Sequence, residues 1–136
     1  MAFTALATKA YKEPITTVWA GSIQGNDNYL YTGIAKAWLN FDNSAVTPTA
    51  RQSNNIASLT DDGLGLLSIN FTTGFTTSGY VIAGCGSFST NSPCFISPQS
   101  TANALTSGIA HIQIVDVNNS RVDVDPGCFL AIGVSN

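Results

Sequence analysis

The stretch SLTDDGLGLLSINFTTGF, residues 58–75, indicates the fold class of this 136-residue chain. In LLSINF, residues 66–71, apolar and polar side chains alternate, so Leu67, Ile69 and Phe71 lie on one face of a strand. This period of two is typical of an antiparallel strand with one face in a core and the other in solvent. We therefore predict that these three apolar side chains are buried.

Two aspartates, Asp61 and Asp62, come directly before the glycines of the same stretch. Aspartate tolerates left-handed backbone and hydrogen-bonds to its own backbone, so Asp62-Gly63 between strand-like segments is a hairpin signal. We interpret both aspartates as solvated turn residues that lead into the strand. The neighbouring sequence offers them no further oxygen ligand.

The same alternation recurs upstream in AKAWLNF, where Ala35, Ala37, Leu39 and Phe41 share one face. Downstream, SGIAHIQIVDV and GCFLAIGV are also strand-like, and turn-forming residues separate all these segments. About six to eight short strands spaced in this way predict an all-β fold, an antiparallel β-sandwich or jelly-roll-like domain.

The segment GYVIAGCGS, residues 79–87, is a continuous apolar run instead of an alternating one. Its small and β-branched residues predict a strand that is covered on both faces. Gly84 and Gly86 within it indicate a close approach of another backbone segment, or a bulge.

The first part of the chain is less regular, with strand-like pieces at Ile15 to Trp19 and Tyr29 to Tyr31. It predicts either a first hairpin of the same sandwich or an N-terminal arm that docks on a neighbouring subunit. The expected organisation is therefore an arm or first hairpin at residues 1–33 and a β-sandwich knob domain at residues 34–136.

Charge is sparse: the chain has five Lys and Arg against eight Asp and Glu, and Ser, Thr and Asn supply 41 residues. The five cations are scattered, so neither nucleic acid nor an anionic lipid surface is an expected partner.

A run of about 20 apolar residues, as membrane insertion needs, is absent from the sequence. The opening MAFTALATKAYKEP lacks a basic start, which predicts synthesis and assembly in a cytoplasm.

The three cysteines, Cys85, Cys94 and Cys128, are odd in number and have no CxxC spacing. The favoured interpretation is buried thiols that act as small hydrophobes. A bridge between Cys85 and Cys94 across a hairpin remains as an alternative.

The one histidine, His111, precedes Asp116 by an odd offset of five residues, which places the two side chains on opposite faces of a straight strand. A Ser-His-Asp relay from this pair is therefore geometrically poor. GxSxG, P-loop and GxGxxG motifs are also missing from the sequence. We predict no catalytic residue, no cofactor and no enzyme activity.

DVNNSRVDVD has acidic and amide side chains at the alternate positions of a calcium loop, but Arg121 stands where the turn glycine is required. A hairpin turn at Asn118-Asn119 explains the stretch more simply, so no metal site is predicted. An irregular Ca²⁺ site that uses Asp116, Asp123 and Asp125 remains as an alternative.

An ordered set of residues carries a family resemblance. It consists of Lys36-Ala37-Trp38 and Asn40-Phe41, then, about twenty residues later, Ser58, Thr60, Asp61, Gly63 and Gly65, and finally Asn70-Phe71-Thr72. From Ala35 onward the chain resembles a domain family found in bacteriophage tail fibres and related virion proteins. It differs from that family in one loop, where GFTTSGY stands in place of a Met-Pro-Asp turn.

The resemblance implies a non-enzymatic virion structural protein, a homotrimeric surface appendage of tail-fibre type whose β-rich knob contacts a host receptor. Its partners would be other virion proteins of the capsid or tail, and host-cell glycan or surface protein. Asp42 to Asn55 and Thr90 to Thr106 are the predicted surface loops for such contacts.

Two alternatives remain open. About 34 residues precede the resembling domain, where a fibre usually carries a long shaft. A capsid head decoration or cement protein, clamped on by its N-terminal arm, is therefore the first alternative. A small carbohydrate-binding module shares the β-sandwich plan and is the alternative of another class.

Overall fold

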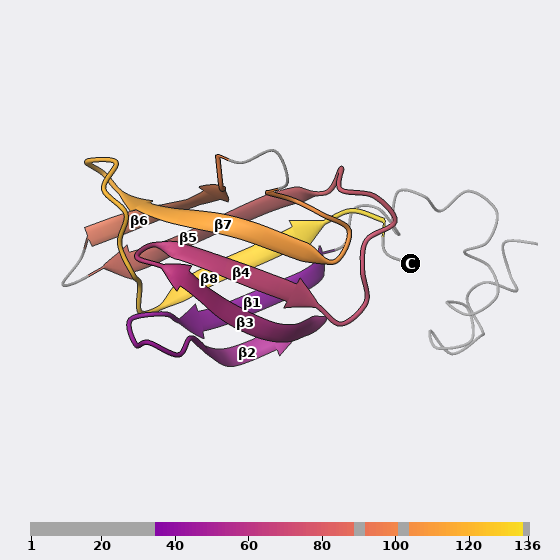
Figure 1. Ribbon diagram of the computed structural model, residues 1–136, viewed down its shortest axis with the longest axis horizontal. Helices are drawn as coiled ribbons and strands as arrows, with labels where there is room; N and C mark the ends of the chain where they lie inside the picture. The colour runs from indigo at the N-terminus through magenta and orange to yellow at the C-terminus, as the bar shows by residue number, and fades with distance from the viewer. Residues whose placement is uncertain (1–34, 89–91, 101–103, 135–136) are drawn as a thin grey trace, which may run out of the picture. The chain divides into compact units, whose positions relative to one another are not determined.

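The computed structural model describes residues 35–88, 92–100 and 104–134, so the predicted arm or first hairpin at residues 1–33 lies outside the described part. Every regular element in that part is a strand (Figure 1). The strands are β1 (Ala35–Asp42), β2 (Thr49–Asn54), β3 (Ile56–Gly63), β4 (Leu66–Phe71), β5 (Val81–Phe88), β6 (Ser92–Pro98), β7 (Ile109–Asp116) and β8 (Gly127–Ile132). Among the described residues, none forms a helix long and apolar enough to cross a membrane.

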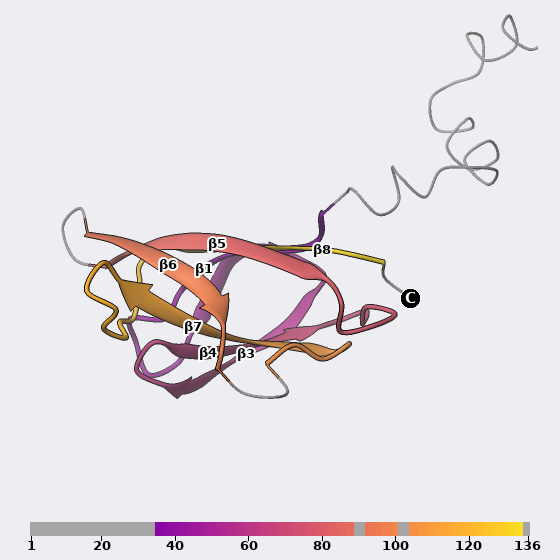
Figure 2. The same cartoon turned by 90° about the horizontal axis from the view of Figure 1, so that it is seen from above.

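The eight strands form one antiparallel sheet in the order β2-β1-β8-β5-β6-β7-β4-β3. Figure 2 shows this sheet folded into two layers, with β1, β5 and β8 in one and β3, β4 and β7 in the other. The two ends of the sheet, β2 and β3, follow each other along the chain, so the sheet is nearly closed. The predicted all-β antiparallel sandwich is confirmed.

The connections bring strands that are distant in the sequence side by side. β5, β6 and β7 are successive neighbours, and β8 returns to lie beside β5, which is a Greek key. β4 lies beside β7 in the same sheet. This second pairing positions the candidate site described below.

Asn55 makes the corner between the two ends of the sheet. Its φ of 59° is left-handed, a conformation that asparagine tolerates better than most residues. Its side chain exchanges two hydrogen bonds with the backbone of Thr73: Nδ2 donates to the carbonyl oxygen at 2.9 Å, and Oδ1 accepts from the N–H at 2.7 Å. The corner is thereby fastened to the loop that follows β4.

The core lies between the two layers and is built from alternate residues of the strands. The face predicted for LLSINF is confirmed, because Leu67, Ile69 and Phe71 of β4 are buried. Of the face predicted for AKAWLNF, Ala37, Leu39 and Phe41 of β1 are buried, while Ala35 at the start of the strand is only partly buried. Residues of β6, β7, β8 and the connection between β7 and β8 add to the core, among them Ile96, Ile112, Ile114, Val124 and Phe129.

The prediction that β5 is covered on both faces is wrong. Val81 is 66% exposed and Cys85 is also exposed, because the outer face of β5 carries no second layer of described residues. The predicted close backbone approach at Gly84 is confirmed, since a Cβ there would lie 2.5 Å from the carbonyl oxygen of Cys128. The run of apolar residues in β5 therefore reflects small residues that pack close to β8. It does not reflect burial of both faces of the strand.

The loop that departs from the resembling family contributes to the core. Phe75 is 1% exposed, and its ring stacks on that of Tyr80 at a centroid distance of 4.2 Å. Phe71 meets both rings edge-on. The Tyr80 hydroxyl donates a hydrogen bond to the carbonyl oxygen of Ile109 at 3.1 Å. This aromatic cluster closes one end of the sandwich.

Candidate functional site

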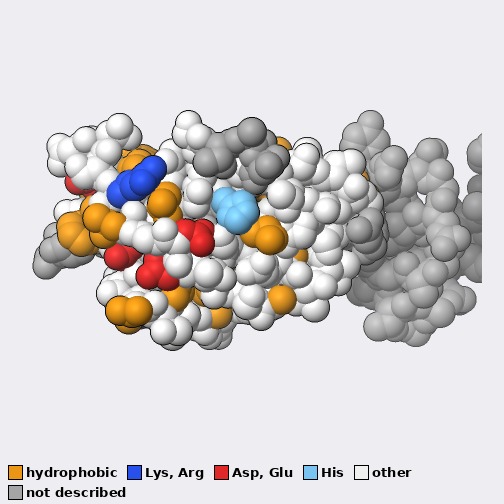
Figure 3. All heavy atoms as spheres, in the orientation of Figure 1, with side chains coloured by type: hydrophobic (Ala, Val, Ile, Leu, Met, Phe, Trp, Pro, Cys, Tyr) orange, Lys and Arg blue, Asp and Glu red, His pale blue; other side chains and the backbone are white. Residues whose placement is uncertain are grey.

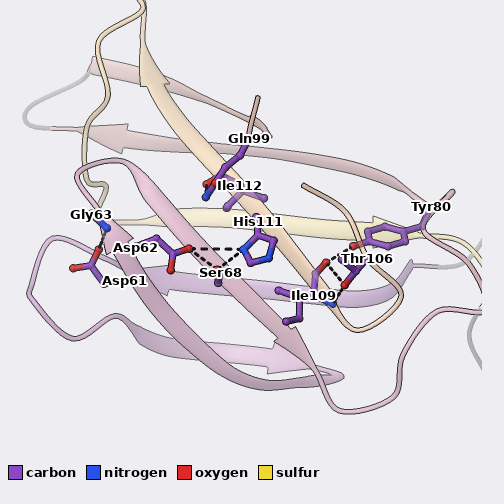
Figure 4. Close-up of polar contacts among 10 residues, drawn as sticks. All are labelled: Asp61, Asp62, Gly63, Ser68, Tyr80, Gln99, Thr106, Ile109, His111 and Ile112. Carbon is purple, nitrogen blue, oxygen red and sulfur yellow. Dashed lines mark hydrogen bonds and ion pairs between the residues drawn. The ribbon is translucent and has the colours of Figure 1, made fainter. Parts of the chain in front are cut away.

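Three neighbouring strands carry a polar cluster on their outer face, formed by Asp62, Ser68 and His111 and called the Asp62 cluster below (Figure 4). Ser68 of β4 and His111 of β7 are directly opposed in the register of those strands. Their sequence neighbours Leu67 and Ile112 belong to the core. Because side chains alternate along a strand, Ser68 and His111 project to the outer face.

Asp62 reaches the cluster from the third strand, β3. The register of β3 against β4 shifts between Asp61 and Gly63, which leaves Asp62 as the extra residue of a β-bulge. Bulges re-aim side chains and occur often beside functional sites. Here the carboxylate of Asp62 lies against the hydroxyl of Ser68.

The three groups form a chain of hydrogen bonds with Ser68 in the middle. The Ser68 hydroxyl bonds to Oδ2 of Asp62, and its Oγ lies 2.6 Å from Nδ1 of His111. A carboxylate cannot donate and a hydroxyl has one proton, so Ser68 donates to Asp62 and accepts from an N–H at Nδ1. This assignment makes Nε2 of the neutral imidazole a hydrogen-bond acceptor.

The two ends of the chain of hydrogen bonds are accessible although its centre is not. Ser68 is 5% exposed, whereas the side chains of His111 and Asp62 are each 32% exposed. Nδ1 of His111 lies 3.9 Å from Oδ2 of Asp62, so protonation of the imidazole would create an ion pair there. Figure 3 shows the imidazole and carboxylate groups gathered on this face of the molecule.

The arrangement differs from a Ser-His-Asp relay. A relay needs the histidine in the middle, where it takes the serine proton while the aspartate holds the imidazole. In the Asp62 cluster the serine is in the middle, its proton is held by Asp62, and its hydroxyl is buried. The cluster can instead offer a carboxylate oxygen and an imidazole nitrogen to the hydroxyl groups of a ligand.

The interpretation of both aspartates as solvated turn residues needs correction. Asp61 accepts a hydrogen bond from the N–H of Gly63 at 2.8 Å, as a turn residue would. Both aspartates belong to β3, and the carboxylate of Asp62 bonds to Ser68 and not to the turn. The turn itself is centred on Leu64-Gly65, where Gly65 has a φ of 64°. A Cβ on Gly65 would also lie 2.7 Å from the carbonyl oxygen of Ile114.

The other candidate pair, His111 and Asp116, is not brought together by a direct contact. The carboxylate of Asp116 accepts hydrogen bonds from the N–H groups of Ser120 at 2.8 Å and Asn118 at 2.9 Å. These bonds lower the pKa of Asp116. Asn119 has a φ of 62°, so the predicted turn at Asn118-Asn119 is confirmed.

The three aspartates of the alternative calcium site hold different partners. Asp116 caps its own turn, whereas Oδ1 of Asp123 accepts from Nδ2 of Asn43 at 3.2 Å and from the N–H of Gly65 at 2.9 Å. Asp125 forms an ion pair with Arg51. Within residues 35–88, 92–100 and 104–134, no group of three or more His, Cys, Asp or Glu side chains could hold a metal ion.

The prediction of buried thiols is right for one cysteine of three. Cys94 is buried, while Cys85 and Cys128 are exposed, and all three are free. Burial raises the pKa of the Cys94 thiol. Cys94 is paired with Gly86 in the sheet and faces the core, whereas Cys85 faces outward, so the alternative bridge between Cys85 and Cys94 is not formed.

The predicted surface loops contain strands that the sequence pattern did not indicate. Asp42 to Asn55 includes β2, and Thr90 to Thr106 includes β6, while residues 90–91 and 101–103 lie outside the described part. β2 has the sequence TARQSN and is exposed at every position. An edge strand of this kind is held by its backbone bonds to β1, and its side chains show no alternation that could reveal it.

No family model matches the sequence, and comparison with curated proteins and with solved structures also gives no match.

Proposed function

We propose that the protein is a structural protein of a bacteriophage virion, a homotrimeric surface appendage of tail-fibre type whose knob contacts the host. Its work is mechanical and adhesive, without catalysis. It is made in the host cytoplasm and resides in the virion, next to other capsid or tail proteins.

The observation that carries the proposal concerns the residues of the family resemblance. They lie on or directly beside β1, β3 and β4, and several of them have a structural role. Phe41 and Phe71 enter the core, and Gly63 and Gly65 have φ of 120° and 64° beside the turn between β3 and β4. A residue pattern with such roles reports on a shared fold. We base the proposal on these four positions, where a substitution would be costly, and on the resemblance to tail-fibre domains to which they belong.

Exposed apolar side chains support association with further chains. On the outer face of one layer, Trp38 of β1 is 41% exposed and Val81 of β5 is 66% exposed. Phe95 of β6 and Val117, just after β7, are likewise exposed. Apolar and aromatic groups of this kind are enriched in interfaces between proteins.

The Asp62 cluster supports an adhesive role toward glycans. Sugars present adjacent hydroxyl groups, and a half-exposed carboxylate beside an imidazole can accept their hydrogen bonds. Ser68 hydrogen-bonds to both side chains and holds them in place before a ligand arrives. Little side-chain conformational entropy is therefore lost when the ligand binds. We therefore propose this face as the host-contacting surface.

Sedimentation of the purified full chain tests the assembly. A trimer is expected, and a stable monomer at micromolar concentration would contradict the architecture.

Electron microscopy of virions labelled with antibodies against the chain then locates the protein. Label on a fibre or short appendage is the expected result; label over the capsid surface would favour the decoration protein.

Binding of the purified trimer to host cells or their surface polysaccharide tests the adhesive role. Asp62→Asn is expected to weaken binding about tenfold, because hydrogen bonds to a charged group contribute roughly 1.5–3 kcal/mol. Asp61→Asn is the matched control, since Asp61 bonds to the turn and not to the cluster. Equal binding by both variants would show that the Asp62 cluster is not part of the contact surface. That result would leave the proposed trimer standing.

A further inference from the structure

Two exposed cysteines lie side by side on the outer face of the sheet. Cys85 of β5 and Cys128 of β8 are directly opposed in register, and both are free. Directly opposed residues of an antiparallel pair project to the same side of the sheet. The two thiols therefore form one dithiol, although 42 residues separate them along the chain.

The backbone geometry suits a bond between them. Opposed residues in antiparallel strands have Cα atoms about 4.5–5.5 Å apart, within the range of about 4.4–6.8 Å seen in disulfides. The Cβ atoms of opposed residues are about 4.5–5.5 Å apart, so closure needs an approach of about 1 Å. β5 and β8 pack tightly here, because a Cβ at Gly84 would lie 2.5 Å from the carbonyl oxygen of Cys128.

The surroundings leave the dithiol open to small reagents. Cys85 and Cys128 line an open depression of about 500 Å³ together with Trp38, Asn40 and Leu130. Nδ2 of Asn40 donates to Sγ of Cys128 at 3.6 Å, which orients that thiol. Cys94, by contrast, is 2% exposed and faces the core, so the chain contains its own unreactive reference thiol.

We propose that Cys85 and Cys128 are a modification site that a low-molecular-weight disulfide converts into a reversible cross-strand disulfide. The thiolate of one cysteine attacks a sulfur of the reagent, forms a mixed disulfide and releases one half as a thiol. The second cysteine then attacks the protein sulfur of that mixed disulfide and releases the other half. Two protein thiols lose two electrons and two protons, and one small disulfide becomes two thiols.

The inference is independent of the proposed virion function. The register, exposure and surroundings of the two cysteines are the same whatever the protein does. The disulfide would link β5 to β8, the pair that completes the Greek key. It would lower the conformational entropy of the unfolded chain and so stabilise the folded one. The bond remains accessible to reducing thiols because both cysteines are exposed.

Incubation of the purified full chain with oxidised glutathione, followed by denaturation, thiol titration and mass spectrometry, tests the site. The expected product has lost two hydrogen atoms, retains one thiol on Cys94 and unfolds at a higher temperature. Dithiothreitol is expected to restore three thiols and the original Tm. Cys94→Ser is expected to close in the same way and retain no thiol.

The single variants distinguish a dithiol from two separate thiols. Cys85→Ser is expected to keep glutathione on Cys128, and Cys128→Ser to keep it on Cys85, because neither has a second thiol to release it. Stable glutathione adducts on both cysteines of the unaltered chain, disulfide-linked dimers, or three unreacted thiols would each overturn the proposal.

Discussion

Oγ of Ser68 lies 2.6 Å from Nδ1 of His111, and the two residues are directly opposed on β4 and β7. The same hydroxyl bonds to Asp62, which a bulge in β3 places beside it. One small side chain therefore ties three strands together on the outer face. The cluster should contribute to stability as well as to any ligand contact.

Ser68→Ala is expected to lower the free energy of unfolding by about 1–2 kcal/mol. The substitution removes both hydrogen bonds of a nearly buried hydroxyl, but water can reach Asp62 and His111 and offset part of the loss. Ser58→Ala is the matched control, because Ser58 is exposed on β3 and its loss should cost under about 0.5 kcal/mol. Chemical denaturation of both variants measures the difference, and equal costs would contradict the structural role of Ser68.

Asn43→Ala is expected to cost about 1–3 kcal/mol of unfolding free energy. Asn43 is 3% exposed, and its Oδ1 accepts from the N–H of Val124 at 2.8 Å while Nδ2 donates to Asp123. Its removal leaves a buried N–H without a partner. Asn54→Ala on the exposed strand β2 is the control for losing an amide, and its denaturation midpoint should barely move. A large shift in the Asn54 variant as well would point to a general effect of asparagine loss.

The limits of sequence-based prediction differ between these features. The faces of AKAWLNF and LLSINF could be predicted, because alternation along one strand is a local property. The contact between Ser68 and His111 depends on β4 lying beside β7, 43 residues further along the chain. No local pattern reports that pairing, and a bulge at Asp62 leaves no mark beyond an Asp-Gly pair that also predicts a turn.

Phe75→Ala is expected to cost about 3–5 kcal/mol, the usual range for deleting a buried phenylalanine. Phe75 is in a loop that looks polar in sequence, yet its ring is packed between Phe71 and Tyr80. The substitution removes both ring contacts and leaves a cavity at one end of the sandwich. Val46→Ala serves as the control, since Val46 is 91% exposed and should change stability by under about 0.5 kcal/mol. Near-native stability of the Phe75 variant would mean that the loop does not close the core.

Stability is expected to fall at alkaline pH because of Tyr80. Burial raises the pKa of its hydroxyl from 10.0 to about 12. The unfolded chain releases this proton near pH 10 while the folded chain keeps it, so the contribution of the protonated hydroxyl is complete below pH 10 and is lost between about pH 10 and 12. This difference between the folded and unfolded pKa values of Tyr80 corresponds to roughly 2–3 kcal/mol of unfolding free energy.

Tyr80→Phe separates this titration from the others. The variant loses the hydrogen bond to the carbonyl oxygen of Ile109 and should be about 1 kcal/mol less stable at neutral pH. Between pH 10 and 12 its free energy of unfolding should fall less steeply than that of the unaltered chain, because it has no proton to release at this position. The Cys94 thiol also has a raised pKa, mainly because it is buried, so the comparison is best repeated in a Cys94→Ala background. Parallel pH profiles with and without the Tyr80 hydroxyl would show that burial does not hold its proton in the folded state.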